Sequence, residues 1–254
     1  MKTIDLNADI GESYGAWRMG DDAAVVPHIS SANIACGFHA GDAQSMRRTV
    51  ALCARHGVAI GAHPSLPDLQ GFGRREMKIA ADEVYAQVLY QIGALAGFAH
   101  AAGTKLHHVK PHGALYNMAA RDRVLADAIA HAVRDFDPGL ILVGLAGSAS
   151  IAAASETQLA CAQEAFCDRR YRADGSLTPR SQAGSVIEEI DQAIEQAVSI
   201  ATRNEAIADD GSHVRVVADT LCVHGDRADA GEFARRLRAA LEHEGLRVAA
   251  TGRA

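Results

Sequence analysis

Short apolar segments alternate along the chain with turns that hold glycine or proline beside a polar side chain. Four of these turns carry histidine, and they read NIACGFHAGD (33–42), AIGAHPS (59–65), HVKPHGALYN (108–117) and LCVHGD (221–226). The opening segment IDLNADIGESYG (4–15) has the same build, with Asp9 in place of histidine. Catalytic side chains of β/α barrels stand at the C-terminal ends of successive parallel strands. The repeated pattern therefore predicts an enzyme whose site is assembled from several strands.

The spacing of apolar positions predicts the elements between these turns. Strands are expected at 3–8, 32–36, 58–62, 106–110, 140–145, 158–165 and 221–224, and the tail 246–251 is expected to return as a strand. Helices are expected at 43–56, 81–102, 123–136, 147–156, 188–203 and 230–244, with a short helical turn after 110. The helix at 81–102 is the clearest, because Val84, Val88, Ile92 and Leu95 recur at helical spacing.

About seven strand–helix units predict a (β/α) barrel, closed or incomplete. A doubly wound open sheet is the alternative, but it would gather the polar turns at one switch point rather than along the whole chain. No linker or low-complexity segment divides the sequence, so we expect one barrel domain over residues 1–254. The polar segment 166–185 is long for a connection in such a fold and indicates a lid or arm.

The composition argues against nucleic-acid binding and against membrane insertion. The formal net charge of −6 gives no basic face for nucleic acid, and aromatic residues make up only 5% of the chain. No apolar run approaches the roughly 20 residues of a membrane span. The first predicted strand begins directly after Met1, which leaves no room for a signal peptide, so we expect a cytoplasmic protein with no membrane partner.

The five cysteines form no C-x-x-C pair, which argues against a disulfide framework and against a zinc knuckle. Cys36 and Cys222 lie inside two of the polar turns and could act as nucleophiles. The simpler interpretation is that they are small buried apolar residues at strand ends.

The strand ends supply candidates for proton transfer. Asp9 is the first choice for a general base or a metal ligand, and an Asx-turn carboxylate is the alternative. Histidine suits proton transfer because its ordinary pKa lies near neutrality. One such histidine alone would be a hydrogen-bonded structural residue, but four at equivalent positions favour a shared pocket: His39, His63, His112 and His224.

Candidate cations lie in three places. Lys110 precedes Pro111 at a strand end, where it could polarise a carbonyl or neutralise a phosphoryl oxygen, or form an ion pair with Glu164 or Asp9. Arg74 and Arg75 follow Gly71-Phe72-Gly73, and a guanidinium on such a loop can bind a carboxylate or phosphate. The long arm opens with Asp168 and Arg169, and Arg180 is a weaker candidate.

Six blocks of the chain closely resemble the LamB/YcsF family, the 5-oxoprolinase A subunits. They are DLNADIGESYG, NIACGFHAGD, GAHPSLPDLQGFGRR, HVKPHGALYN, EAFCDRRYRADGSLTPR and TLCVHGD, in family order from residue 4 to about residue 240. The resemblance implies a distorted seven-stranded (β/α) barrel of the glycoside hydrolase/deacetylase group. It also implies ATP-dependent opening of 5-oxo-L-proline to L-glutamate, together with separate B and C subunits.

Such a reaction needs cations for the substrate carboxylate and for phosphate, a base for water, and an acid for the departing ring nitrogen. We assign catalysis to Asp9, Lys110, His63, His112, His224 and Glu164. We assign substrate and phosphate binding to Asn7, Glu12, His39, Arg74, Arg75, Asn117, Asp168 and Arg169.

Two cofactors stay open at this point. The chain has no G-x-x-x-x-G-K-[ST] loop, so we expect ATP to be bound mainly by the partner subunits. The related deacetylases hold a divalent metal with an Asp and two His, which Asp9, His39 and His63 could imitate, although no diagnostic metal motif is present. Two alternatives to an ATP-dependent enzyme complex remain. One is a metal-dependent amidohydrolase or deacetylase that acts alone, and the other is a non-catalytic subunit that binds the substrate.

Overall fold

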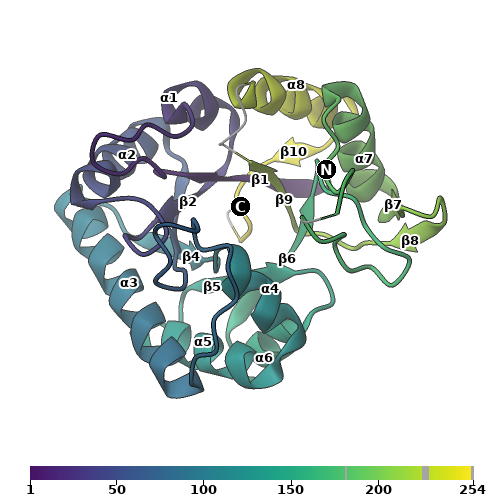
Figure 1. Cartoon of the computed structure of the whole chain (residues 1–254). Helices are drawn as coiled ribbons and strands as arrows, with labels where there is room; N and C mark the ends of the chain where they lie inside the picture. Colours follow the sequence, from purple (N-terminus) through teal and green to yellow (C-terminus); the bar gives the residue numbers. More distant parts are fainter. Residues whose placement is uncertain (181, 225–228, 253–254) are drawn as a thin grey trace.

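The computed structural model describes residues 1–180, 182–224 and 229–252, and its centre is a closed barrel of seven parallel strands (Figure 1). The strands follow the order β1 (Thr3–Ile10), β2 (Ser31–Ala35), β3 (Ala59–His63), β4 (Leu106–Val109), β5 (Ile141–Leu145), β6 (Ala160–Phe166) and β9 (Thr220–His224). β9 pairs with both β6 and β1, which closes the barrel. The predicted barrel is confirmed, and the open sheet is excluded.

The tail returns as predicted. β10 (Arg247–Val248) pairs in parallel with Thr3 and Ile4 at the start of β1. A small hairpin of β7 (Glu205–Ile207) and β8 (His213–Arg215) lies outside the barrel and was not predicted. Its strands have three residues each, too few to set up a recognisable alternation.

Helices surround the strands (Figure 1). The main ones are α2 (Ala43–His56), α3 (Ala81–Ala101), α4 (Gly113–Arg121), α5 (Arg123–Phe136), α6 (Ala149–Glu156), α7 (Ile190–Arg203) and α8 (Ala230–His243). The predicted helices are found within a few residues of their expected ends. Two short elements, α1 (Asp22–Val25) and η1 (Val26–His28), were not predicted.

Local chemistry explains the ends of α2. The side chain of Asp42 accepts a hydrogen bond from the amide of Ser45 and so caps the first turn. Gly57 ends the helix in the left-handed conformation with φ 67°, which glycine adopts without steric cost. Between these caps, Met46, Val50 and Cys53 are buried on one face against the barrel. Within the described residues, no helix is both long and apolar enough to span a membrane.

β1 runs two residues further than predicted, and this places Asp9 inside the barrel wall. Its backbone lies opposite Asn33 of β2 on one side and His224 of β9 on the other. Successive side chains of a strand point to opposite faces. Leu6, Ala8 and Ile10 therefore pack among the apolar core residues, while Asp5, Asn7 and Asp9 share the other face and are also buried.

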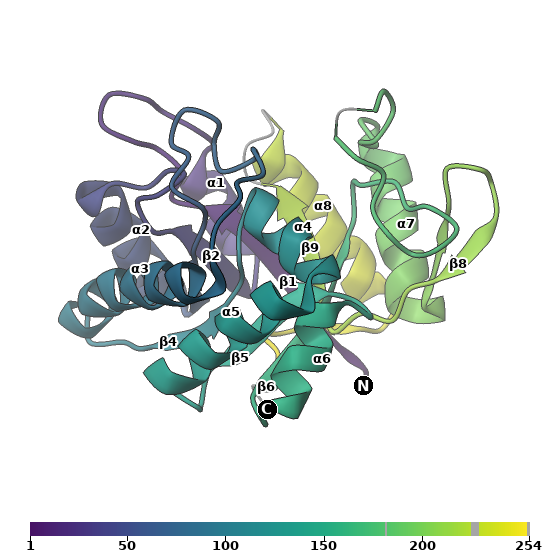
Figure 2. The ribbon, with the colours of Figure 1, turned by 60° about the horizontal axis from the view of Figure 1, so that its bottom comes forward.

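The inner face of the barrel is consequently polar along several strands, unlike the layers of branched apolar residues that fill most (β/α) barrels. The buried polar residues on the strands are Asp5, Asn7, Asp9, Ser31, Asn33, His63, His108, Glu164 and Thr220. Figure 2 shows the loops after β1, β3 and β6 on one end of the barrel, with the start of the chain at the other end. The polar interior thus opens toward the end where the long loops lie.

Candidate active site

Lys110 is the charge centre of the barrel interior. Its Nζ lies 2.7 Å from Glu164 Oε1, 2.9 Å from Asp9 Oδ1 and 3.1 Å from Cys222 Sγ. Burial alone would lower the pKa of Lys110, but the carboxylates of Asp9 and Glu164 outweigh it and keep that pKa well above its ordinary value. Lys110 is therefore a buried cation that holds two carboxylates, and it cannot serve as a base near neutral pH.

Amide and hydroxyl groups extend this network toward the N-terminal ends of the strands. Asn7 donates to Glu164 Oε1 at 3.0 Å and to Thr220 Oγ1 at 2.7 Å, and Thr220 in turn donates to Asp5 Oδ2 at 2.7 Å. Asn33 donates to Asn7 Oδ1 at 2.7 Å and to Asp9 Oδ1 at 2.8 Å. Asp9 Oδ1 is thus held by two donors, which fixes the direction of the other oxygen, Oδ2.

That second oxygen faces a pair of histidines. His63 Nε2 lies 3.3 Å from Asp9 Oδ2 and 2.9 Å from His112 Nδ1. His63 Nδ1 donates to the carbonyl of Lys110 at 2.7 Å, and His112 Nε2 donates to the carbonyl of Phe72 at 2.9 Å. Because a carbonyl can only accept, both rings use one N–H there, and their remaining nitrogens point toward each other. A proton or a metal ion between them would satisfy both.

His39 and Glu12 complete this group. The ring of His39 stacks on that of His112 with centroids 3.8 Å apart, and its Nε2 lies 3.4 Å from Glu12 Oε1. Glu12 Oε1 also lies 3.8 Å from His112 Nδ1. Burial, followed by the neighbouring histidines, lowers the pKa values of His39 and His112 well below the ordinary value, so both rings are neutral at pH 7.

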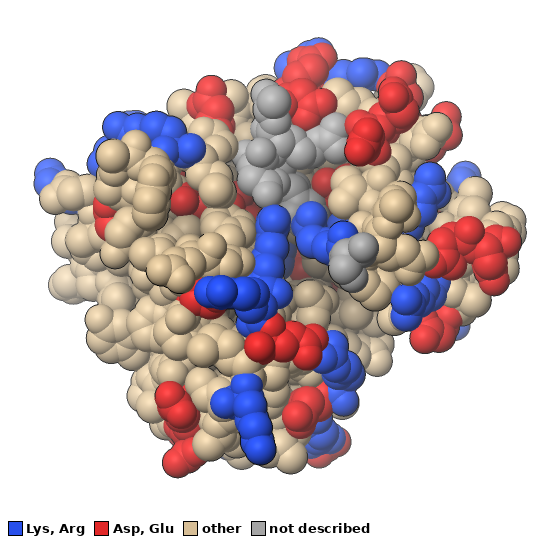
Figure 3. Space-filling model, viewed as in Figure 1, with Lys and Arg blue, Asp and Glu red and all other residues tan. Residues whose placement is uncertain are grey.

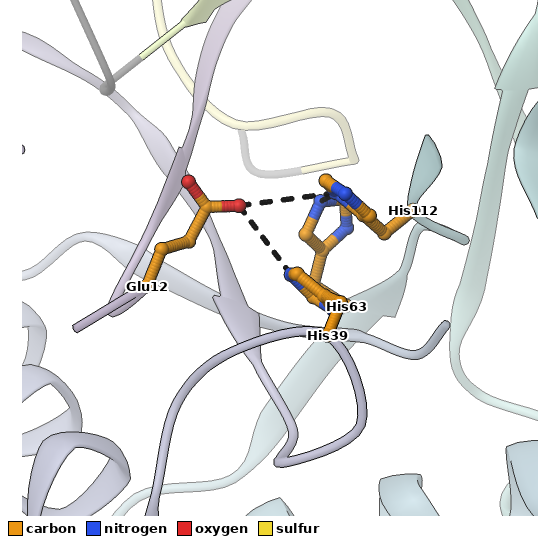
Figure 4. Close-up of side chains that lie close together, drawn as sticks. All are labelled: Glu12, His39, His63 and His112. Carbon is orange, nitrogen blue, oxygen red and sulfur yellow. Dashed lines mark hydrogen bonds and ion pairs between the residues drawn. The ribbon is translucent and has the colours of Figure 1, made fainter. Parts of the chain in front are cut away.

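The four side chains converge from different parts of the chain (Figure 4). One ligand atom from each of Glu12, His39, His63 and His112 falls in a group in which all atoms lie within 4.8 Å of one another. Neither ring nitrogen of the buried His39 has a hydrogen-bond partner among the described residues. Neutral imidazoles and a carboxylate are the ligands of tetrahedral zinc sites, in which bond lengths of about 2.0–2.2 Å separate the ligand atoms by about 3.4 Å. This buried cluster could therefore hold a divalent metal.

The predicted metal set overlaps this cluster. His39 and His63 belong to both, whereas the cluster adds Glu12 and His112. Asp9 lies beside it, with one oxygen engaged by Lys110 and Asn33 and the other near His63. A ligand role for Asp9 stays a prediction.

Two glycines allow the loop after β3 to cover the histidines. A Cβ on Gly73 would overlap Ser65 Oγ and would lie 2.9 Å from atoms of both His39 and His112, and the residue has φ +65°. A Cβ on Gly113 would lie 2.5 Å from the carbonyl oxygen of Gly73. Only glycine fits at these contacts, so the G-F-G and H-G motifs of the sequence are packing requirements of the site.

A cavity of about 610 Å³ opens above the polar interior. Its lining includes Asp9, Glu12, His63, Lys110 and His112, and the walls include Tyr116, Asn117 and Phe166. Among the described residues, five arginines line the same cavity: Arg74, Arg121, Arg169, Arg172 and Arg180. A volume of this size is ordinary for a small-molecule site.

Comparisons with known proteins give this site a family context. The model of the LamB/YcsF family matches residues 4–254. The chain belongs to the LamB/YcsF family. Its LamB/YcsF relatives include the 5-oxoprolinase A subunit of Bordetella pertussis, 59% identical over 97% of this chain and 98% of the relative. Another is the 5-oxoprolinase A subunit of Geobacillus thermodenitrificans, 55% identical over 98% of this chain and 97% of the relative.

Solved structures agree with the LamB/YcsF assignment. The lactam utilization protein of Thermus thermophilus superposes with a TM-score of 0.93 and 52% identity, over 98% of this chain and 100% of that one. A family 4 carbohydrate esterase from Streptomyces lividans superposes with a TM-score of 0.52 and 12% identity, over 100% of this chain and 96% of that one. The second match concerns the fold alone: this chain and that esterase share the expected (β/α) barrel.

The structure brings most of the predicted site residues of this LamB/YcsF chain together. The cavity is lined by eight of them: Asp9, Glu12, His63, Arg74, Lys110, His112, Asn117 and Arg169. Three more contact residues of this network or lining: Asn7, His39 and Glu164. Arg75 instead pairs with Asp68, and its side chain is 65% exposed. Asp168 is buried but is not among the cavity-lining residues. The backbone of His224 ends β9 opposite Asp9, whereas its side chain lies outside the described part of the structure.

The predicted list did not include Asp5, Asn33 and Thr220 of the network, nor Tyr116 and Arg172, which line the cavity. The alternation D-L-N-A-D-I along 5–10 could have revealed Asp5, because it places a third polar residue on the face of Asn7 and Asp9.

The two cysteines at strand ends behave as buried thiols. Burial raises the pKa of Cys36 to about 12, and it raises the pKa of Cys222 well above its ordinary value.

Proposed function

We propose that this chain is the A subunit of an ATP-dependent 5-oxoprolinase, which opens the ring of 5-oxo-L-proline to L-glutamate together with partner B and C subunits. One observation carries the proposal. The cavity floor joins a restrained carboxylate, Asp9, to a buried cation and to a histidine, in a family whose relatives are named as 5-oxoprolinase A subunits. Restrained acid–base groups of this kind suit hydrolysis of an amide bond.

Coupling to ATP answers the chemical difficulty of the substrate, since a five-membered lactam is a poor electrophile. The lactam oxygen attacks the γ-phosphorus of ATP and ADP leaves. Water then adds to the activated ring carbon, the C–N bond breaks, and the ring nitrogen takes a proton. A second water hydrolyses the resulting acyl phosphate, so the products are glutamate, ADP and phosphate. Because the chain has no P-loop, we place the ATP site mainly on the partner subunits.

Asp9 is the proposed proton carrier. Its Oδ1 is held by Lys110 and Asn33, while Oδ2 belongs to a residue that lines the cavity. Oδ2 takes the proton of the attacking water and later delivers it to the departing ring nitrogen. His63 Nε2, 3.3 Å away, can accept a hydrogen bond from Asp9 when Oδ2 carries the proton. The ammonium of Lys110, 2.9 Å from Oδ1, stabilises negative charge on Asp9.

The cluster of Glu12, His39, His63 and His112 would hold the divalent metal of the site. When bound there, such an ion would polarise the ring carbonyl as a Lewis acid. This cluster also favours a second candidate function, a metal-dependent amidohydrolase that acts alone.

Reconstitution separates these functions. Purified chain, the B and C subunits, ATP and 5-oxo-L-proline are combined, each component is omitted in turn, and glutamate and ADP are measured. The proposal predicts glutamate only in the complete mixture, with ADP formed alongside it. Glutamate formed by the chain and a metal ion without ATP would support the second candidate. ATP hydrolysis by the isolated chain with 5-oxo-L-proline would contradict an ATP site on the partners, and absence of glutamate from every mixture would refute the proposal.

A further inference from the structure

One buried histidine of the barrel interior has no role in the proposed mechanism. His108 lies on β4, two positions before Lys110, and is 2% exposed. Figure 3 shows the central hollow of the molecule surrounded by Lys and Arg side chains, and His108 is not among the residues that line the cavity. A substrate bound in the cavity would not touch His108, so any effect of this ring on the reaction must pass through its protein neighbours.

Hydrogen-bond chemistry fixes the orientation of the neighbouring Asn33 side chain. One end of its amide lies 2.8 Å from Asp9 Oδ1 and 2.7 Å from Asn7 Oδ1. A carboxylate and an amide oxygen can only accept, so this end is the NH₂ group. The other end, Asn33 Oδ1, lies 2.8 Å from His108 Nε2. Because an amide oxygen cannot donate, the proton of this contact belongs to His108 Nε2.

The second nitrogen of the ring is also held. His107 Nδ1 lies 3.2 Å from His108 Nδ1. In a neutral ring with its proton on Nε2, Nδ1 is an acceptor, so a proton on His107 Nδ1 completes this contact. Contacts at both nitrogens restrain the plane of the His108 ring and favour the same tautomer.

The register of the strands explains how His108 reaches Asn33. Asp9 of β1 stands opposite Asn33 of β2. Gly61 of β3 stands opposite Asn33 on one side and His108 of β4 on the other. Neighbouring strands lie about 4.8 Å apart, so the His108 ring must bridge roughly 10 Å from β4 to β2. A Cβ on Gly61 would overlap three atoms of that ring, so the glycine leaves the space that the bridge requires.

We propose that His108 is a positioning residue for Asp9 and acts through Asn33. The hydrogen bond from His108 Nε2 holds the Asn33 amide so that its NH₂ group points at Asp9 Oδ1, which leaves Oδ2 directed toward the reaction. Without that bond, the amide can rotate and present its oxygen to the carboxylate, and two acceptors repel each other. This proposal rests on the proposed function, because it adds a residue to the acid–base group assigned there.

Substitution of His108 tests this role in the reconstituted system with 5-oxo-L-proline, ATP and the B and C subunits. In His108→Leu, kcat for glutamate formation should fall about tenfold or more, because small displacements of a reacting group are costly. KM for 5-oxo-L-proline should stay within about twofold, since the ring does not touch the substrate. His108→Gln should recover most of the parent kcat, because its amide nitrogen can donate from the place of Nε2. His100→Leu, on the exposed face of α3, is the control and should match the parent chain.

A double-mutant cycle separates positioning from packing. Asn33→Leu should lower kcat, and adding His108→Leu to it should cause little further loss, because the connection from His108 to Asp9 is already broken. Losses that multiply in full would overturn the proposal. So would a His108→Gln variant as slow as His108→Leu, or a rise in KM with kcat unchanged.

The tautomer of His108 is a further test that needs no turnover and no folded Leu variant. Long-range ¹H–¹⁵N NMR correlations of the labelled full chain show which ring nitrogen carries the proton, and the His108→Gln variant identifies the signals by their loss. We expect the proton on Nε2, and a proton on Nδ1 alone would overturn the proposal. Absence of glutamate with the parent chain in the complete mixture would instead refute the proposed function, and the NMR result would still decide the bond between His108 and Asn33.

Discussion

Lys110 neutralises part of the negative charge of the site, because its one ammonium group pairs with two buried carboxylates, those of Asp9 and Glu164. Lys110→Met leaves Asp9 and Glu164 without their cation. We expect a loss of about 3–5 kcal/mol in the free energy of unfolding, the usual cost of breaking a buried pair. We also expect glutamate formation to fall about 100-fold or more in the reconstituted system.

Denaturant unfolding and the glutamate assay check this prediction. Lys105→Met, an exposed lysine in the turn before β4, is the control and should behave like the parent chain. Adding Glu164→Gln to Lys110→Met removes one of the uncompensated charges and should restore part of the stability. If the single variant is as stable as the parent chain, the ion-pair network has been misread.

The pKa values of His39 and His112 predict how stability depends on pH in the metal-free protein. Each imidazole has a folded-state pKa below its unfolded value of about 6.5, so it binds protons more weakly when folded. Protonation below that pH therefore favours the unfolded chain. Above pH 6.5 these histidines should not reduce the free energy of unfolding. Between pH 6.5 and 5 that free energy should fall by up to about 1.4 kcal/mol per pH unit for each histidine.

Urea unfolding at several pH values, with chelator present, measures this slope. His39→Asn should flatten it, whereas substitution of the exposed His243 by Asn should leave it as in the parent chain. Equal slopes for all three proteins would show that the imidazole of His39 does not have the lowered pKa described above.

Single residues were predictable where they lie at or just beyond the end of a predicted strand. Asp9, His63, Lys110 and His112 each end an apolar run, and all four line the cavity. Asn33 was not predicted although it holds Asp9, because an amide in the middle of a strand carries no local sign that its face is the polar interior. Arg75 and Arg74 are adjacent in the sequence. Which of them faces the cavity depends on the salt bridge between Arg75 and Asp68, which the sequence pattern does not specify.

The loop after β3 is the element that seals the histidine cluster. Gly73→Ala would place a methyl group against Ser65, His39 and His112, in addition to the strain of a positive φ. Gly103 has a similar φ of +72°, but nothing lies within 4 Å of the place where its Cβ would stand, which makes Gly103→Ala the matched control. In both variants the strain of an alanine at positive φ should lower the free energy of unfolding by about 1 kcal/mol.

In Gly73→Ala, overpacking should lower the free energy of unfolding by a further amount of about 1–3 kcal/mol, the usual cost of an added methyl group in a packed place. The rate of glutamate formation should fall as well. Thermal unfolding and the glutamate assay of the two variants separate strain from contact. Equal effects of the two substitutions would mean that the loop does not press on the histidines.

Element boundaries followed from the sequence where periodicity is long. α3 was predicted within one residue of its observed end, since its apolar stripe covers the whole helix. The hairpin of β7 and β8 was missed because its strands are short and lie outside the barrel. β1 was predicted too short, because Asp9, soon followed by Gly11, resembles the start of a turn when the barrel interior is assumed to be apolar.

At the scale of the whole molecule, barrel closure converts distant motifs into one site. Glu12, His39, His63 and His112 span about a hundred positions of the chain, yet their ligand atoms lie within 4.8 Å of one another. If this cluster binds a divalent metal, Zn²⁺ should raise the unfolding temperature of chelator-treated protein, because a ligand that binds only the folded state stabilises it. Glu12→Gln should reduce the shift, and substitution of the exposed Glu244 by Gln should not. No shift in the parent chain would exclude a zinc site there.

The central claim is that Asp9 performs the proton transfers of ring opening. Its most direct test is the rate of glutamate formation by the Asp9→Asn variant with 5-oxo-L-proline, ATP and the B and C subunits. Asp82→Asn, on the exposed start of α3, is the control. The asparagine keeps the size of the side chain but cannot carry the proton, so the rate should fall about 100- to 10,000-fold while the control keeps the parent rate. An Asp9→Asn variant that forms glutamate at the parent rate would contradict the account and would leave the chain as a subunit that only binds the substrate.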